Sequence, residues 1–339
     1  MAKVGKARDG NRSFYPPLLN TPFVRLLQSI FPWLAHTVYK LDLIVTSEPL
    51  VQLNVLQGKP CLLVCNHSTF DDRIVMFLLS AQLGEPFYYM AAYEQFLGWN
   101  AKFYQWIGAY SVQRGMADRD SIAQTLQLLS QPDCKLVIFP EGGCSFQNDT
   151  VMPFRPGAIQ IGLQAMARSV KQGNPIPDLY VVPISLKYRY TGKMTPVIEA
   201  ALQRLEQALA VSGTGDYYQR LRTIAAAVLQ RFEQDYGMTP PDPEDWNQRI
   251  AALKATVLQQ CEQRLELASN PKDPDRERVY RVRHALEQQQ SLVLAGVSDP
   301  WAMTAKAMMR VLNFDAIYDG YVGEKPTPER FLDTLTRLE

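Results

Sequence analysis

The 339-residue sequence has no long apolar run, few histidines and almost no net charge. No stretch approaches the roughly 20 consecutive apolar residues of a membrane-spanning helix, so we expect a protein that is soluble or lies on a membrane surface. A formal charge of +1 argues against a nucleic-acid-binding protein. The five cysteines, an odd number without paired spacing, predict reduced thiols in a cytoplasmic setting.

Other signals are also missing. Three histidines and no Cys-x-x-Cys pair argue against a metal site, and no glycine-rich phosphate loop occurs. The basic, polar stretch 1–13 is not followed directly by an apolar core, so we predict no signal peptide. The composition, 47% hydrophobic and 20% charged, is that of a globular chain with one large domain or two ordinary ones.

The most informative stretch is C-L-L-V-C-N-H-S-T-F-D-D, at residues 61–72. Its first five residues are typical of a buried strand. The polar residues that follow predict a turn and then a helix, with a hydroxyl side chain of the turn as the N-cap of that helix. Residues five apart do not face each other in a helix, so the turn is what allows His67 and Asp72 to meet. A carboxylate that orients a histidine makes a general base for activating a hydroxyl.

Two plainer interpretations of these residues stay open. His67 can be a polar residue at the end of a strand, without a catalytic role. Asp71 and Asp72 can serve only to stabilise the positive end of a helix dipole. Support for catalysis therefore has to come from other parts of the chain.

Between residues 41 and 195, short apolar runs alternate with helical patterns, which predicts an α/β domain with a mostly parallel sheet flanked by helices. Polar features follow three of the runs, namely His67, Arg114 and residues 140–143. The carboxyl ends of parallel strands share one edge of the sheet, where ligands bind, so we expect these features to converge. The predicted strands are 41–45, 61–65, 87–91, 109–112, 135–139 and 179–186, and the predicted helices are 71–83, 93–106, 119–130 and 157–171.

Residues 1–40 combine a basic tail with an aromatic, apolar segment that Pro32 should kink or end. In one interpretation the segment is amphipathic and docks on a membrane surface. In the other it is an ordinary helix packed on the core, and amphipathicity alone does not decide. The side chains expected to enter the bilayer are Phe23, Leu27, Phe31 and Trp33.

From 196 to 339, alanine, leucine, glutamine, glutamate and arginine dominate and strand-like runs disappear. We predict an all-helical C-terminal domain without a fixed-period repeat. A lid, a partner surface and a stabilising buttress all stay open as its role. The predicted helices are 196–211, 217–236, 244–267, 275–294, 300–313 and 328–338.

Residues 64–188 resemble the glycerolipid acyltransferase family, whose best-known members make phosphatidic acid from lysophosphatidic acid. The resemblance rests on four motif regions in the family's order, and four together are far more specific than a single N-H-x4-D. They are Asn66-His67-Ser68-Thr69-Phe70-Asp71-Asp72 for N-H-x4-D, G-A-Y-S-V-Q-R at 108–114, F-P-E-G at 139–142 with F-R-P-G-A at 154–158, and V-P-I-S-L at 182–186.

The resemblance implies an O-acyltransferase that moves a fatty acyl group from acyl-carrier protein or acyl-CoA to a hydroxyl of a lysophosphatidate-like glycerolipid acceptor. His67, oriented by Asp72, would take the hydroxyl proton as the oxygen attacks the thioester, with no covalent enzyme intermediate. Glu141 would shape the acceptor site. No metal or organic cofactor is needed, because the thioester supplies the energy.

Binding residues follow from the same resemblance. Backbone N–H groups near Gly142 and Gly143 are candidate donors to the developing oxyanion. Arg114 and Arg155 are cations suited to a phosphate or another anionic headgroup; the alternative for each is a solvated surface residue.

One departure from the family pattern concerns the third block, where Thr, Arg and Ser usually follow P-E-G. Here Gly143 and Cys144 take the places of the threonine and the arginine. A thiol cannot replace a cation that binds phosphate through two hydrogen bonds. Either Arg114 or Arg155 therefore takes over this role, or the acceptor is not a simple lysophosphatidate. We interpret Cys144 as a small loop residue rather than a nucleophile, because no histidine besides His67 lies in a matching context.

Two other functions stay open. A thioesterase or lipid hydrolase would use water as the acceptor in the same site, and a lipid-binding or scaffold protein would keep the fold without catalysis. The intact His67, Asp72 and Glu141 favour catalysis. We expect a cytoplasmic, peripheral membrane protein whose partners are acyl-carrier protein or acyl-CoA, a lipid acceptor and the membrane surface, with no nucleic acid.

Overall fold

The computed structural model describes residues 14–114, 118–239, 244–290, 302–315 and 317–339, which fall into two compact units. The α/β unit comprises the chain up to Cys144 together with Val151–Leu186. The helical unit comprises Ser145–Thr150 together with Lys187–Glu339. The predicted fold class is confirmed, since a parallel sheet flanked by helices precedes a helical C-terminal region.

The sheet of the α/β unit has five strands in the order β3-β2-β4-β1-β5, and every neighbouring pair is parallel. All five residues of β1 are buried, as the uninterrupted apolar run predicts for an inner strand of a parallel sheet. Because β1 and β4 are neighbours, the loops that leave their carboxyl ends start side by side. The strands are β1 (Cys61–Cys65), β2 (Tyr88–Ala92), β3 (Ala109–Val112), β4 (Lys135–Ile138) and β5 (Tyr180–Ile184).

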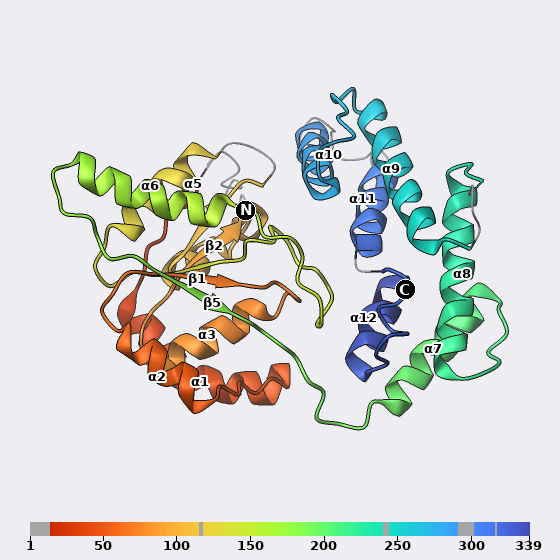
Figure 1. Ribbon diagram of the computed structural model, residues 1–339, viewed down its shortest axis with the longest axis horizontal. Helices are drawn as coiled ribbons and strands as arrows, with labels where there is room; N and C mark the ends of the chain where they lie inside the picture. Colours follow the sequence, from red (N-terminus) through yellow and green to blue (C-terminus); the bar gives the residue numbers. More distant parts are fainter. Residues whose placement is uncertain (1–13, 115–117, 240–243, 291–301, 316) are drawn as a thin grey trace, which may run out of the picture. The chain divides into compact units, whose positions relative to one another are not determined.

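Helices cover both faces of this sheet (Figure 1). Successive side chains of a strand point to opposite faces, and on β1 Cys61, Leu63 and Cys65 join the core of α1 and α3, whereas Leu62 and Val64 join the core of α5 and α6. The helices of this unit are α1 (Thr21–Leu34), α2 (Ser47–Val55), α3 (Asp72–Leu83), α4 (Ala101–Trp106), α5 (Arg119–Leu129) and α6 (Gly157–Lys171).

Two predicted elements of this unit are wrong. Residues 41–45 alternate between half-buried and exposed but form no strand, and α2 follows them. Their alternation reflects packing of Leu41, Leu43 and Val45 on the core without a hydrogen-bonded partner strand. The helix predicted for 93–106 is broken into the 3₁₀ turn η2 (Tyr93–Phe96) and α4, with Gly98 at a φ of 87° between them, a conformation that favours glycine.

The N-terminal helix packs on the core with most of the side chains that we expected in a bilayer. Leu27 and Phe31 lie against the core of the unit, and the ring of Phe31 meets that of Phe77 edge to face at 4.9 Å. Phe23 is half-buried, so of the four predicted side chains only Trp33 is exposed. Pro32 does not end α1, which continues into the π-helical turn η1 (Ala35–Tyr39).

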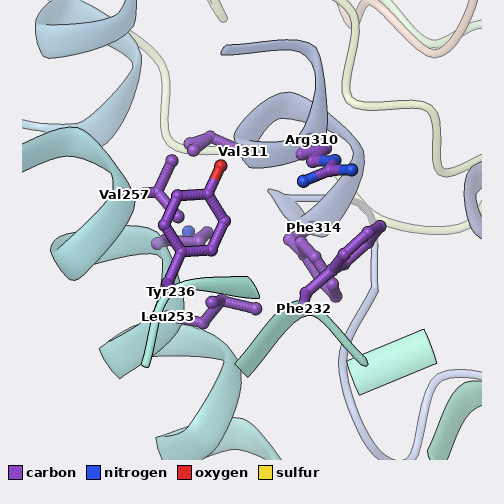
Figure 2. Close-up of a pocket in the computed structure, with 8 residues that line it drawn as sticks. Phe232, Tyr236, Leu253, Val257, Arg310, Val311 and Phe314 are labelled. Atoms are coloured by element: carbon purple, nitrogen blue, oxygen red, sulfur yellow. The ribbon is translucent and has the colours of Figure 1, made fainter. Parts of the chain in front are cut away.

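The helical unit has a small pocket bordered by α8 (Tyr217–Asp235), α9 (Trp246–Arg264) and α11 (Ala302–Asp315) (Figure 2). The rings of Phe232 and Phe314 meet edge to face at 5.6 Å, and the Arg310 guanidinium lies 4.3 Å from the centre of the Phe232 ring. The volume is about 10 Å³, which is room for about one water molecule. This pocket is therefore too small for an acyl chain.

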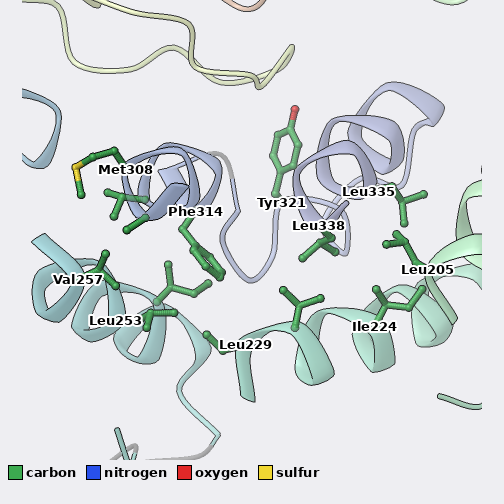
Figure 3. Packing of buried hydrophobic residues seen from close by; sticks show 14 of the residues in the cluster. Leu205, Ile224, Leu229, Leu253, Val257, Met308, Phe314, Tyr321, Leu335 and Leu338 are labelled. Atoms are coloured by element: carbon green, nitrogen blue, oxygen red, sulfur yellow. The ribbon is translucent and has the colours of Figure 1, made fainter. Parts of the chain in front are cut away.

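The core of the helical unit is continuous across its helices (Figure 3). Apolar side chains of α7 and α8, such as Leu205 and Ile224, share this core with Leu335 and Leu338 of α12. The helices are α7 (Thr195–Leu209), α8 (Tyr217–Asp235), α9 (Trp246–Arg264), α10 (Asp275–Gln290), α11 (Ala302–Asp315) and α12 (Pro328–Leu338).

Part of the helical unit consists of related helices, although their spacing along the chain is not constant. Residues 217–234 and 246–263 form equivalent helices, α8 and α9, and each is capped by an aspartate, Asp216 or Asp245, that accepts the N–H of the third helical residue. At a spacing of 29, identical residues are Gln219 and Gln248, Arg220 and Arg249, Ala226 and Ala255, Val228 and Val257, Leu229 and Leu258, Gln230 and Gln259, Glu233 and Glu262, and Gln234 and Gln263.

A buried ion pair joins each of these helices to the next, and we call each such junction a corner. A glutamate near the end of one helix receives two hydrogen bonds, at 2.7–3.0 Å, from an arginine at the fourth position of the next helix. The same corner therefore recurs three times, between α7 and α8, α8 and α9, and α9 and α10. The pairs are Glu206 with Arg220, Glu233 with Arg249, and Glu262 with Arg278.

The segment Ser145–Thr150 belongs to the helical unit although Cys144 and Val151 on either side of it belong to the α/β unit. The Asp149 carboxylate accepts from Arg330 Nε at 2.8 Å and pairs with Lys187 Nζ at 2.7 Å. The chain that leaves the third motif block at Cys144 thus enters the helical unit at once.

Candidate active site

The centre of the candidate site is a histidine–aspartate pair at the carboxyl end of β1. His67 Nδ1 lies 2.7 Å from Asp72 Oδ2, and the same oxygen accepts the Thr69 N–H at 3.0 Å. Asp72 is fully buried and the His67 side chain is 20% exposed. Because a carboxylate accepts hydrogen bonds, neutral His67 carries its proton on Nδ1 and exchanges protons through Nε2. The structure therefore brings together the two residues whose roles as base and orienter we predict.

The turn that presents His67 is fixed by the side chain of Asn66. Its side-chain amide donates to the Leu186 carbonyl at 3.0 Å and its oxygen accepts the Leu186 N–H at 2.6 Å. The amide also donates to Ser68 Oγ at 3.0 Å. The Asn66 side chain thus hydrogen-bonds between the ends of β1 and β5 as a backbone peptide group would. The only sequence signal for this role is its place in the N-H motif.

Glu141 ties two loops together at the same edge of the sheet. It is buried, and its two carboxylate oxygens accept the backbone N–H groups of His67 at 2.6 Å and of Met152 at 3.2 Å. These contacts fix the backbone beside the histidine rather than its ring. The predicted role of Glu141 in shaping the acceptor site stays a prediction.

The ring of His67 is held between an aromatic residue and a thiol. Phe139 stacks on it with a centroid separation of 4.3 Å. Cys144 Sγ lies 3.3 Å from Nε2 and 3.7 Å from Nδ1. These similar distances place the sulfur over the ring rather than in line with the Nε2 lone pair. The thiol of Cys144 thus contacts His67, the one histidine in a matching context, and our interpretation of Cys144 as a small loop residue stays a prediction.

Gly142 and Arg155 lie against each other in the segment that follows β4. Gly142 has a φ of 74°, and a Cβ atom there would come 2.8 Å from Arg155 Nε, so the backbone turn and the arginine both require glycine. The Gly142 N–H donates to the Phe139 carbonyl at 3.1 Å, which argues against its predicted role as an oxyanion donor. That role stays a prediction for Gly143.

Arg114 lies at the same edge of the sheet but further along it. It follows β3, three strands from β1, which at about 4.8 Å per strand is a lateral separation of about 14 Å. Its guanidinium forms an ion pair with Glu94 at 3.0 Å. Of the two predicted arginines, the structure thus places Arg155, and not Arg114, beside the third-block loop.

The region that contains this site matches a known protein family. Residues 46–187 match the family described as Acyltransferase. This part of the chain is therefore an acyltransferase domain of the family that the motifs resemble, and it spans β1 to β5 with His67, Asp72, Glu141 and Cys144. It gives the protein a general acyltransferase activity. Searches of curated proteins and of solved structures found no match to the chain.

Proposed function

We propose that the protein transfers a fatty acyl group from acyl-CoA or acyl-carrier protein to a hydroxyl of a lysophosphatidate-like glycerolipid. The observation that carries the proposal is the 2.7 Å contact between His67 Nδ1 and Asp72 inside the acyltransferase domain. Asp72 orients the ring, and Nε2 takes the proton of the attacking hydroxyl. The thioester makes transfer favourable, so the reaction requires neither a metal nor an organic cofactor.

Arg155 is our candidate for the acceptor's anionic headgroup. It lies against Gly142, one residue after Glu141 and two before Cys144. A guanidinium can bind phosphate through two parallel hydrogen bonds, as the arginine of the usual third block would. Arg114, about 14 Å along the sheet edge, is better placed for a more distant phosphate, such as those of the acyl carrier.

We also propose that the α/β unit lies on a membrane surface through an apolar stripe on α1. Among the described residues, no helix combines the length and apolar character needed to cross a bilayer. Leu26, Ile30 and Trp33 are exposed and recur at helical spacing on the face of α1 opposite its core contacts. The exposed aromatics Phe103 and Trp106 of α4 extend the stripe, because both rings meet Phe23 of α1 edge to face.

The double variant Leu26→Ser/Trp33→Ser is expected to bind phosphatidylcholine–phosphatidylglycerol vesicles at least about tenfold more weakly than the wild type. The reason is that full burial of one large apolar side chain contributes roughly 1.5–3 kcal/mol to the free energy of binding. Co-sedimentation measures it. Ile159→Ser/Leu163→Ser, on exposed positions of α6 across the sheet, is the matched control and should bind like the wild type. If both double variants lost vesicle binding equally, the loss would reflect nonspecific apolar contact with the vesicle, and the proposed role of α1 would be contradicted.

Acceptor identity and reaction type are tested together. Purified full-length protein receives labelled acyl-CoA or acyl-carrier protein with lysophosphatidate, glycerol 3-phosphate, a monoacylglycerol or lysophosphatidylcholine. We expect an ester product, highest with lysophosphatidate and absent in His67→Ala. Free fatty acid alone would support the hydrolase, and lipid binding without either product would support a non-catalytic protein.

A further inference from the structure

The thiol of Cys144 lies within the candidate active site and contacts its base. The sulfur is 3.3 Å from His67 Nε2, the nitrogen through which we expect proton exchange, while Asp72 holds Nδ1. A thiol, an imidazole and a carboxylate in this connection are the arrangement that activates cysteine nucleophiles. In direct transfer from donor to acceptor, by contrast, the acceptor hydroxyl itself would approach Nε2 along its lone pair, which the sulfur, lying over the ring, does not occupy.

We propose that Cys144 is a second catalytic residue, which accepts the acyl group from the donor and passes it to the acceptor. This inference rests on the acyl transfer proposed above and changes its route from one step to two. The position that in the usual family pattern carries a headgroup-binding arginine would then carry the nucleophile. Binding of the headgroup would be left to Arg155.

In the first step His67 Nε2 takes the thiol proton as the Cys144 sulfur attacks the carbonyl carbon of the donor thioester. The new carbon–sulfur bond forms, the bond to the carrier sulfur breaks, and the carrier leaves as a thiol with the proton from His67. One thioester replaces another, so this step is close to balanced in free energy and needs no oxidant or reductant.

In the second step His67 takes the proton of the acceptor hydroxyl, whose oxygen attacks the carbonyl carbon of the acyl-cysteine. The carbon–oxygen bond forms, the bond to Cys144 breaks, and the sulfur recovers the proton. The sulfur lies over the imidazole ring, so rotation of a side chain has to align it with Nε2. Such pairs are often loosely aligned before substrate binds.

The other four cysteines are poor competitors for the acyl group. All four are buried, as Cys144 is too, and burial raises the pKa of Cys61 and Cys65, that of Cys134 to about 12 and that of Cys261 to about 11. Thiolate, the reactive form, is therefore scarce at these positions at neutral pH. An acyl adduct should consequently locate to one peptide.

The test is to trap the adduct. Full-length protein is incubated with palmitoyl-CoA without an acceptor, quenched in acid and digested for mass spectrometry. We expect a hydroxylamine-sensitive palmitoyl group on the Cys144 peptide, which lysophosphatidate or the preferred acceptor of the panel then discharges. Cys134→Ala should keep the adduct, whereas Cys144→Ala should lose it together with ester synthesis, by at least about 100-fold. Cys144→Ser should retain a slowly discharged, hydroxylamine-resistant ester.

The outcomes separate this inference from the proposed function. Ester synthesis that survives in Cys144→Ala within about threefold, with no adduct in the wild type or Cys144→Ser, would overturn the role of Cys144 and leave the acyltransferase proposal standing. An adduct that forms but is passed to no lipid would support Cys144 as nucleophile and overturn the lipid acceptor. Circular dichroism of each variant confirms that it is folded.

Discussion

His67→Ala is expected to lower kcat/KM for ester synthesis by about 10²–10⁴, the usual contribution of a general base. Asp72→Asn should cost at least about 10², because an amide beside Nδ1 favours the tautomer with the proton on Nε2, which cannot accept another. The contact of Asp72 with both His67 Nδ1 and the Thr69 N–H is the structural basis. Initial rates with a labelled acyl donor measure both losses.

His36→Ala is the matched control for the histidine. His36 also contacts an aspartate, Asp42, at 2.8 Å, but both side chains are about two-thirds exposed and belong to η1 and the segment after it. We expect its ester synthesis to stay close to that of the wild type. Near-normal activity of His67→Ala, with circular dichroism unchanged, would remove His67 from the chemistry.

Glu262→Gln is expected to destabilise the helical unit by about 3–5 kcal/mol, because it leaves the buried Arg278 guanidinium without its ionic partner. Glu262 is fully buried and accepts two hydrogen bonds from Arg278, at 3.0 and 2.8 Å. Urea denaturation of the full chain measures the loss, and hydrogen exchange in α9 and α10 locates it. Glu199→Gln is the control and should change stability far less, because the Glu199 side chain is 32% exposed and Arg220 keeps its second partner, Glu206.

The same corner predicts loss of stability in acid. Burial raises the pKa of Glu262, but hydrogen bonds from Arg278 and Ser269 and the charge of Arg281 outweigh burial and lower the pKa overall. The unfolded chain therefore takes up a proton at higher pH than the folded chain does. The free energy of unfolding should fall as the pH drops below about 4.5, and Glu262→Gln should lack this part of the fall. An identical acid profile would contradict the assignment.

Much of the α/β unit follows from the sequence because its strands are short apolar runs that end in polar turns. The run at 61–65 is β1 at the predicted bounds, and 109–112 is β3. The prediction failed where alternation had another cause, as at 41–45, whose side chains pack on the core without a partner strand. Local patterns show which side chains are buried but not whether a strand has a neighbour.

The candidate site was predictable as a set of loops, but not in its detail. Parallel strands put His67, Arg114 and Glu141 at one edge of the sheet, whereas strand order, which decides that β1 and β4 are neighbours and β3 is distant, depends on long-range packing. The contact between Cys144 and His67 joins residues 77 positions apart. Only the loop conformation after β4, with Gly142 at positive φ, reveals it.

The related helices of the helical unit do not form a repeat of fixed period, because their spacing changes. Glu206 precedes Glu233 by 27 residues, and Glu233 precedes Glu262 by 29. The turns between helices differ in length, while each corner keeps its Glu–Arg pair. The physical unit of the repeat is this pair, whose members lie on different helices.

The central claim is that His67 and Asp72 act as one base in acyl transfer, and a double-mutant cycle tests it most directly. Ester synthesis is measured for the wild type, His67→Ala, Asp72→Asn and the double variant. Groups that act as a unit give strongly non-additive losses, so we predict that the double variant loses no more than His67→Ala alone, within about threefold. Losses that multiply would show that the two residues act independently and would contradict the account.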